Sequence, residues 1–182
     1  MALSSTLYQF HVNLSDVDRG IYKEVELRVP LHPSETISSL LTRVIAFGLN
    51  LQEGLEFTQG ISNPDLPSLW VKDLTGAIQV WIDVGSPSAK RLHKASKTAR
   101  SVRVYTYRDP EILIREVAGS EIHRIMEIEF FALDPSFLKA LGKNLERQNR
   151  WELLFAEGEV SVITKEETYQ CDLKQLDLRT GA

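Results

Sequence analysis

The sequence predicts a mixed α/β fold in which helices flank a mixed β-sheet and antiparallel hairpins are added. Segments rich in β-branched and aromatic residues alternate with segments whose apolar residues recur at helical spacing. Clusters of turn-forming residues separate these segments, and no repeat, low-complexity stretch or linker divides the chain. Because 43% of the 182 residues are hydrophobic, we expect one domain, residues 1–182, with one sizeable core.

The N-terminal part is predicted to be a hairpin followed by a helix. Residues 5–14 and 20–29 are rich in β-forming residues, and the turn formers "SDVDRG" separate them. "HPSET", residues 32–36, then resembles a helix start, with Glu35 placed to complement the positive end of the helix dipole. The apolar residues that follow at helical spacing are Ile37, Leu40, Leu41, Val44 and Ile45.

The middle of the chain is predicted to contain a loop, a hairpin and a basic helix. Residues 55–67 indicate a loop with a short strand, and residues 69–85 indicate two strands around the turn "DLTG". Strand alternation places Trp81 and Asp83 on one face and Ile82 on the other. Residues 86–101 form the predicted helix.

The remaining segments continue the alternation of helices and strands. "VRVYTY" predicts a core strand, "DPEILIREVA" a short helix, "HRIMEIEFFAL" a strand and "DPSFLKALGKNL" a helix opened by Asp134 and Pro135. The tail, residues 151–173, predicts a small antiparallel meander.

Composition excludes several classes of protein and site. The chain has 21 Lys and Arg against 25 Asp and Glu, so no overall basic field favours nucleic acid or membrane. The single cysteine, Cys171, excludes an intramolecular disulfide and is expected to be a buried, inert thiol. Without a signal or membrane-spanning pattern we expect a cytoplasmic protein with no membrane partner. Neither a phosphate loop, a nucleophile elbow nor a zinc-binding spacing is present.

Three acids precede the basic helix in the order that a metal-dependent phosphodiesterase needs. They are Glu35 at a helix start, Asp65 in a loop and Asp83 on a strand. Asp65 and Asp83, with the Val84 carbonyl and water, would offer oxygen ligands suited to Mg²⁺ or Mn²⁺. A nearby cation would stabilise the charge that develops on a phosphate during hydrolysis.

Several motifs resemble the YaeQ family of small bacterial proteins over nearly the whole chain: "HPSET", "TRVIAF", "LEFTQG", "PDLPSLW" and "VWIDVG". This resemblance implies a restriction-endonuclease-like core related to the PD-(D/E)XK nucleases, with a rearranged active site. It implies no settled activity.

In the usual nuclease motif, a metal-binding acid and a lysine alternate on one strand face. Here Asp83 is followed by Gly85, so the lysine position is empty, and the next helix offers Arg91 and Lys94 instead. The resemblance makes Asp65 the first acid of the motif, although Asp73 competes for that role, and it makes Glu35 the acid of the first helix. The predicted catalytic set is Glu35, Asp65, Asp83, Arg91 and Lys94.

The basic helix is the candidate nucleic-acid interface. Its cations would contact the phosphate backbone, and the alternative is an ordinary solvated face. The residues concerned are Lys90, Lys94, Lys97 and Arg100. Trp70 and Trp81 could stack on bases, although core packing is the competing interpretation.

Two functions therefore compete. A divalent-metal-dependent nuclease requires convergent acids with a cation in reach. A catalytically inactive binding or adaptor module tolerates a salt bridge that fills the site, for example Glu35 with Arg43. A small phosphate-ligand hydrolase is a third alternative.

Overall fold

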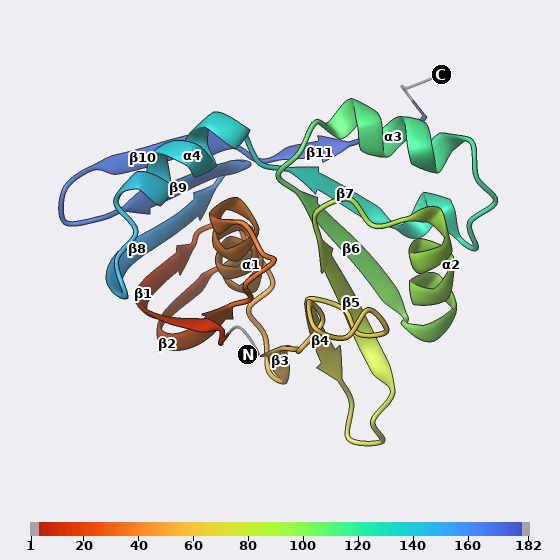
Figure 1. The fold of residues 1–182 in the computed structure, drawn as a ribbon, viewed down its shortest axis with the longest axis horizontal. Helices are drawn as coiled ribbons and strands as arrows, with labels where there is room; N and C mark the ends of the chain where they lie inside the picture. The colour runs from red at the N-terminus through yellow and green to blue at the C-terminus, as the bar shows by residue number, and fades with distance from the viewer. Residues whose placement is uncertain (1–3, 180–182) are drawn as a thin grey trace. The chain divides into compact units, whose positions relative to one another are not determined.

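The computed structural model of the protein describes residues 4–179, which form two compact units. Unit 1 contains the chain up to Leu49 together with Leu133–Leu173, and unit 2 contains Asn50–Ala132 together with the chain from Lys174 onward. Each unit has its own sheet and helices (Figure 1). The single domain expected from the sequence stays a prediction.

Unit 1 is built on a five-stranded mixed sheet of order β10-β9-β8-β1-β2. Strands from the two ends of the chain, red and blue in Figure 1, combine in it, because β1 pairs with β8 in parallel while the other neighbours are antiparallel. The strands are β1 Thr6–Asp16, β2 Ile21–Leu31, β8 Gln148–Ala156, β9 Glu159–Ile163 and β10 Thr168–Asp172.

Two helices, α1 (Ile37–Leu49) and α4 (Pro135–Lys143), complete unit 1. Alternate residues of β1, among them Phe10, Val12 and Leu14, are buried, as expected for a strand with one face in a core. Helix α1 packs closely on β8 at Gly48, where an added Cβ would lie 2.7 Å from Leu153 Cδ2. A larger residue at this position would force the Leu153 side chain to shift.

Unit 2 is built on a six-stranded mixed sheet of order β11-β7-β6-β5-β4-β3. The central pairs β5–β6 and β6–β7 are parallel, and the outer pairs are antiparallel. The strands are β3 Leu55–Phe57, β4 Leu69–Lys72, β5 Ile78–Val84, β6 Ser101–Thr106, β7 Glu129–Ala132 and β11 Lys174–Leu176.

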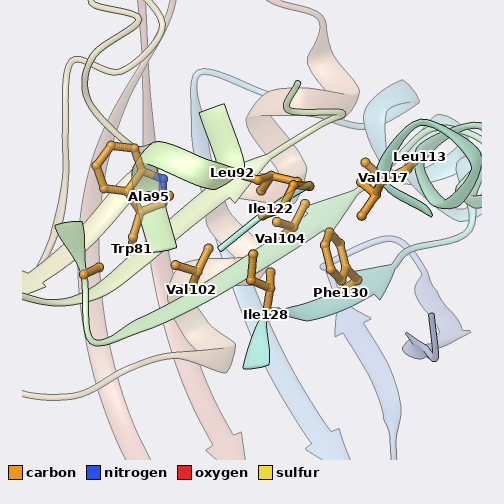
Figure 2. Close-up of a cluster of buried hydrophobic side chains, with 11 residues drawn as sticks. Trp81, Leu92, Ala95, Val102, Val104, Leu113, Val117, Ile122, Ile128 and Phe130 are labelled. Carbon is orange, nitrogen blue, oxygen red and sulfur yellow. The ribbon is translucent and has the colours of Figure 1, made fainter. Parts of the chain in front are cut away.

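Helices α2 (Ala89–Thr98) and α3 (Pro110–Ala118) pack on one face of the parallel strands. The Ser88 side chain caps α2 by accepting from the Arg91 amide, and Asp109 caps α3 by accepting from the Glu111 amide. Figure 2 shows the resulting core, in which side chains from both helices meet those of the strands. Its labelled members are Trp81, Leu92, Ala95, Val102, Val104, Leu113, Val117, Ile122, Ile128 and Phe130.

The mixed α/β class and most elements are confirmed, with three corrections. Two mixed sheets replace the one expected. Residues 123–133 are not a continuous strand, because Arg124 adopts a left-handed conformation (φ 47°) before a 3₁₀ turn, η1 (Ile125–Glu127). Strand β11 was not predicted, since its three residues pair with β7 from more than 40 positions away.

Within residues 4–179 no helix is both long and apolar enough to cross a membrane. Cys171 lies half-buried on β10, and burial raises the pKa of its thiol to about 11. The thiol is thus protonated at neutral pH, in agreement with the expected inert role.

Candidate functional site

The loop between β3 and β4 carries Asp65, and its shape is fixed by short-range contacts. The Thr58 amide donates to the Ser68 carbonyl at 3.1 Å, and the Thr58 hydroxyl donates to the Pro67 carbonyl. Gly60 lies so close to the Pro67 carbonyl oxygen that a Cβ would overlap it. The loop therefore turns back on itself and presents Asp65 outward.

Asp65 is an exposed acid paired with the basic helix. Its amide donates to the Asn63 side chain at 3.0 Å, an Asx turn, and its carboxylate accepts from Lys94 Nζ at 2.5 Å. The hydrogen bond from Lys94 and the charge of Lys94 lower the pKa of Asp65. Asp65 is therefore ionised at neutral pH.

Asp83 lies on β5, and its carboxylate meets Arg91 of α2. Its side chain is only 2% exposed, and its carboxylate accepts two hydrogen bonds from Arg91, from Nε at 2.7 Å and from Nη2 at 2.7 Å. Burial lowers the pKa of Arg91. The hydrogen bond to Asp83 and the negative charge of Asp83 outweigh this effect, so the pKa of Arg91 is raised overall. The pair is a two-point, charge-assisted contact.

Arg91 also binds the loop that carries Asp65. Its Nη1 donates to the Pro64 carbonyl and its Nη2 donates to the Leu66 carbonyl at 2.6 Å. One guanidinium thus joins the acid of β5 to both neighbours of Asp65. Four of the predicted catalytic residues, Asp65, Asp83, Arg91 and Lys94, therefore form one cluster in unit 2.

Gly85 stands where the usual nuclease motif has its lysine. Its φ is +104°, a conformation that residues with a Cβ rarely adopt. An added Cβ would lie 3.7 Å from Tyr107 Cε1, in ordinary van der Waals contact. The backbone conformation, rather than lack of space, therefore disfavours a lysine at this position.

Glu35 lies in unit 1, just before α1, in a closed network. Its carboxylate accepts from Arg43 Nε and Nη2, both at 2.8 Å, and from the Ser39 hydroxyl at 2.9 Å. The side chains of Glu35 and Arg43 are 1% and 4% exposed. The salt bridge between Glu35 and Arg43, which a binding or adaptor module would tolerate, is therefore present.

The basic helix α2 exposes a row of cations. Lys90 and Lys97 on α2 are exposed and have no carboxylate partner in the part of the chain that the structure describes. Arg100 is also exposed but lies after α2, which ends at Thr98, and not on the helix as predicted. Lys94 belongs to the same face but is paired with Asp65. The predicted nucleic-acid contacts of these four residues stay a prediction.

Asp73 and Trp81 each had a structural and a functional interpretation, and the structure places both in structural positions. Asp73 holds the turn before β5, where one carboxylate oxygen accepts from the amides of Thr75 and Ala77 and from the Thr75 hydroxyl. Trp81 is 2% exposed in the core, and its Nε1 has no hydrogen-bond partner among residues 4–179. Asp73 therefore stabilises the turn, and Trp81 packs in the core.

The sequence did not identify the backbone carbonyls of Pro64 and Leu66 as partners of Arg91. No residue type marks a carbonyl acceptor, because every residue has one and only the chain's path decides where it points. Among residues 4–179, no three His, Cys, Asp or Glu side chains gather in a way that could hold a metal ion. A metal here would have two carboxylates at most.

The family model described as YaeQ protein matches residues 1–173 of this chain. The chain is 36% identical over 107 residues to the uncharacterized protein YaeQ of Escherichia coli, a match that spans 59% of this chain and 59% of that protein. Two crystal structures are similar throughout. The YaeQ protein of Xanthomonas axonopodis pv. citri has a TM-score of 0.87 at 31% identity, covering 94% of this chain and 98% of that one. That of Pseudomonas syringae has a TM-score of 0.88 at 30% identity, covering 95% and 96%.

Proposed function

The chain belongs to the YaeQ family, and we propose that its unit 2 carries a variant PD-(D/E)XK nuclease-like site that hydrolyses nucleic-acid phosphodiesters. One observation carries the proposal. Arg91 binds both oxygens of Asp83 and the carbonyls on either side of Asp65, so one guanidinium holds the Asp65 loop next to Asp83. The resemblance implies the same order along the chain: an acid in a loop, then an acid on a strand, then a cation. A restriction-endonuclease-like core is part of the same proposal.

The donors fit Mg²⁺ or Mn²⁺ in type. Both ions accept oxygen ligands, and Mg²⁺ is commonly held by one or two carboxylates with water filling the other positions. Asp65 and Asp83 would hold the ion, which would lower the pKa of a bound water and neutralise phosphate charge. Arg91 donates one hydrogen bond to each oxygen of Asp83, so a metal bound there would use the remaining lone pairs or displace one of these hydrogen bonds.

The cations of α2, together with Arg100 just after it, would contact the phosphates of the substrate. Arg91 and Lys94 lie at the two acids and would take the place of the motif lysine at the reacting phosphate. Lys90, Lys97 and Arg100 would bind neighbouring phosphates of the strand. We do not extend the proposal to Glu35, because its oxygens are engaged inside a buried network.

A second candidate function is a binding module without catalysis. It is favoured by the pairing of every candidate acid: Glu35 with Arg43, Asp65 with Lys94 and Asp83 with Arg91. In this alternative the ion pairs are the functional state and no metal enters. Nucleic acid would then bind through the cations of α2 alone.

Calorimetric titration of Mn²⁺ and Mg²⁺, combined with cleavage assays on labelled DNA and RNA, distinguishes the nuclease from the binding module. The variant is Asp83→Asn, and the matched control is Asp172→Asn, an exposed acid on β10. The nuclease proposal expects saturable metal binding and metal-dependent cleavage that Asp83→Asn abolishes and Asp172→Asn keeps. Binding of nucleic acid without metal or cleavage would favour the second candidate.

A further inference from the structure

Two residues beside Gly85 offer groups that the proposed site still lacks. The carboxyl ends of the parallel strands β5 and β6 lie next to each other, and the Gly85 amide donates to the Tyr105 carbonyl at 2.9 Å. Tyr107 and Arg108 follow β6 directly. Side chains that leave neighbouring parallel strands at this edge commonly form ligand sites in α/β proteins.

Tyr107 borders the space into which a residue at position 85 would extend. A Cβ on Gly85 would lie 3.7 Å from its Cε1 and 3.8 Å from its hydroxyl oxygen. The side chain is half-buried, and its hydroxyl has no hydrogen-bond partner among residues 4–179. Because Gly85 comes two residues after Asp83, about 7 Å of strand separates the backbone of Gly85 from that of Asp83.

Arg108 places a cation next to this phenol. Its guanidinium carbon lies 5.6 Å from the centroid of the Tyr107 ring, a cation–π contact that orients both side chains. Its amide donates to the Thr106 hydroxyl at 3.1 Å, which fixes the chain where β6 ends. The nearest acid in sequence, Asp109, accepts from the Glu111 amide at the start of α3, and within the described chain Arg108 has no carboxylate partner.

We infer that Tyr107 and Arg108 bind a phosphate of the nucleic-acid strand next to Gly85, as donors additional to Arg91 and Lys94. The phenol would donate one hydrogen bond, and the guanidinium would add two donors and a positive charge. The inference rests on the proposed function for the class of ligand, a phosphodiester backbone. It does not require cleavage.

Equilibrium binding of fluorescein-labelled oligonucleotides, followed by anisotropy over a range of salt concentrations, tests this inference. The variants are Tyr107→Phe and Arg108→Gln. Their matched controls are Tyr22→Phe on β2 and Arg115→Gln in α3, which make the same chemical changes at exposed positions away from Gly85. Single-stranded and duplex DNA and RNA are compared without added metal, so that cleavage does not interfere.

We expect Arg108→Gln to weaken binding about tenfold, since a hydrogen bond to a charged group typically contributes this much. The slope of log K against log salt should become shallower by about one, the signature of a lost phosphate contact. Tyr107→Phe should weaken binding roughly threefold to tenfold. The controls should match the wild type.

An unchanged affinity and slope in both variants overturns the inference, as does a wild type that binds none of the oligonucleotides. Binding without any metal-dependent cleavage overturns the nuclease proposal alone. In that case the salt dependence of binding still decides whether Tyr107 and Arg108 contact phosphate. Thermal melting of each variant verifies folding.

Discussion

Two ion pairs, Glu35 with Arg43 in unit 1 and Asp83 with Arg91 in unit 2, have the same chemistry and differ in exposure. Each joins residues eight apart, and in each the arginine donates from Nε and Nη2 to both carboxylate oxygens. In the first pair the acid and the arginine are 1% and 4% exposed. In the second the acid is 2% exposed but the arginine is 23% exposed.

The difference separates a structural pair from a candidate site. Glu35 and Arg43 are enclosed by unit 1, and Arg43 also donates to the Pro30 carbonyl at 2.6 Å, so the pair closes a local network. Arg91 remains partly exposed to water, and it also donates hydrogen bonds to the loop that carries Asp65. A ligand could therefore exchange with Arg91 but not with Arg43.

The largest expected effect comes from Arg43→Ala. Removing the arginine leaves Glu35 buried without its charge partner, which typically costs about 3–5 kcal/mol. Urea unfolding measures the free energy, and Arg28→Ala on the exposed face of β2 is the control, with a change near zero. A smaller loss of unfolding free energy for Arg43→Ala than for Arg91→Ala would contradict the view that the Glu35–Arg43 pair is the more enclosed one.

Arg91→Ala should cost less, about 2–3 kcal/mol, because water can reach part of the space that the guanidinium leaves. Under the nuclease proposal, Mn²⁺ should then raise the melting temperature of the variant more than that of the wild type, since the metal no longer competes with Arg91 for Asp83. Thermal melts with and without Mn²⁺ measure this. An equal response of both proteins would speak against metal binding at Asp83.

Gly85→Ala is expected to cost about 1–2 kcal/mol through backbone strain at φ +104°. Gly85→Lys should carry the same strain and should not enhance cleavage, because the obstacle is the backbone. Gly119→Ala is the matched control: the φ of Gly119 is −88° and an added Cβ meets only the Arg115 carbonyl at 4.0 Å. Equal stability of the Gly85 and Gly119 variants would contradict the strain argument.

The smallest expected effect is the pH dependence of the exposed pair Asp65–Lys94. The pKa of Asp65 is lowered in the folded protein, so its contribution to stability is present above its ordinary pKa and is lost as pH falls through the folded value. Asp65→Asn should therefore be slightly less stable than the wild type at pH 7. The two should become equal in acid, and melting curves at both pH values test this.

Much of the fold was predictable because short-range sequence patterns indicate most of its helices and strands. The opening hairpin, the capped helices α2 and α3 and the strand bearing Asp83 follow from alternation, turn residues and capping residues near in sequence. The assignment of strands to two sheets was not predictable. It depends on pairing between distant segments, such as β1 with β8 and β11 with β7.

The candidate site was predictable as residue types and not as contacts. The acids, the empty lysine position and the basic helix were visible in the sequence. Nothing in it showed that Arg91 binds the carbonyls beside Asp65, or that Tyr107 lies against Gly85, because both contacts join segments about 20 residues apart or more.

The sequence by itself determined the resemblance to the family, most of the order of the elements and the residue types of the candidate site, since these depend on composition and short-range spacing. The tertiary structure decided which acid pairs with which cation and how far water reaches each pair. Those properties depend on the packing of distant segments, and packing made Glu35–Arg43 a closed pair and left Asp83–Arg91 partly open.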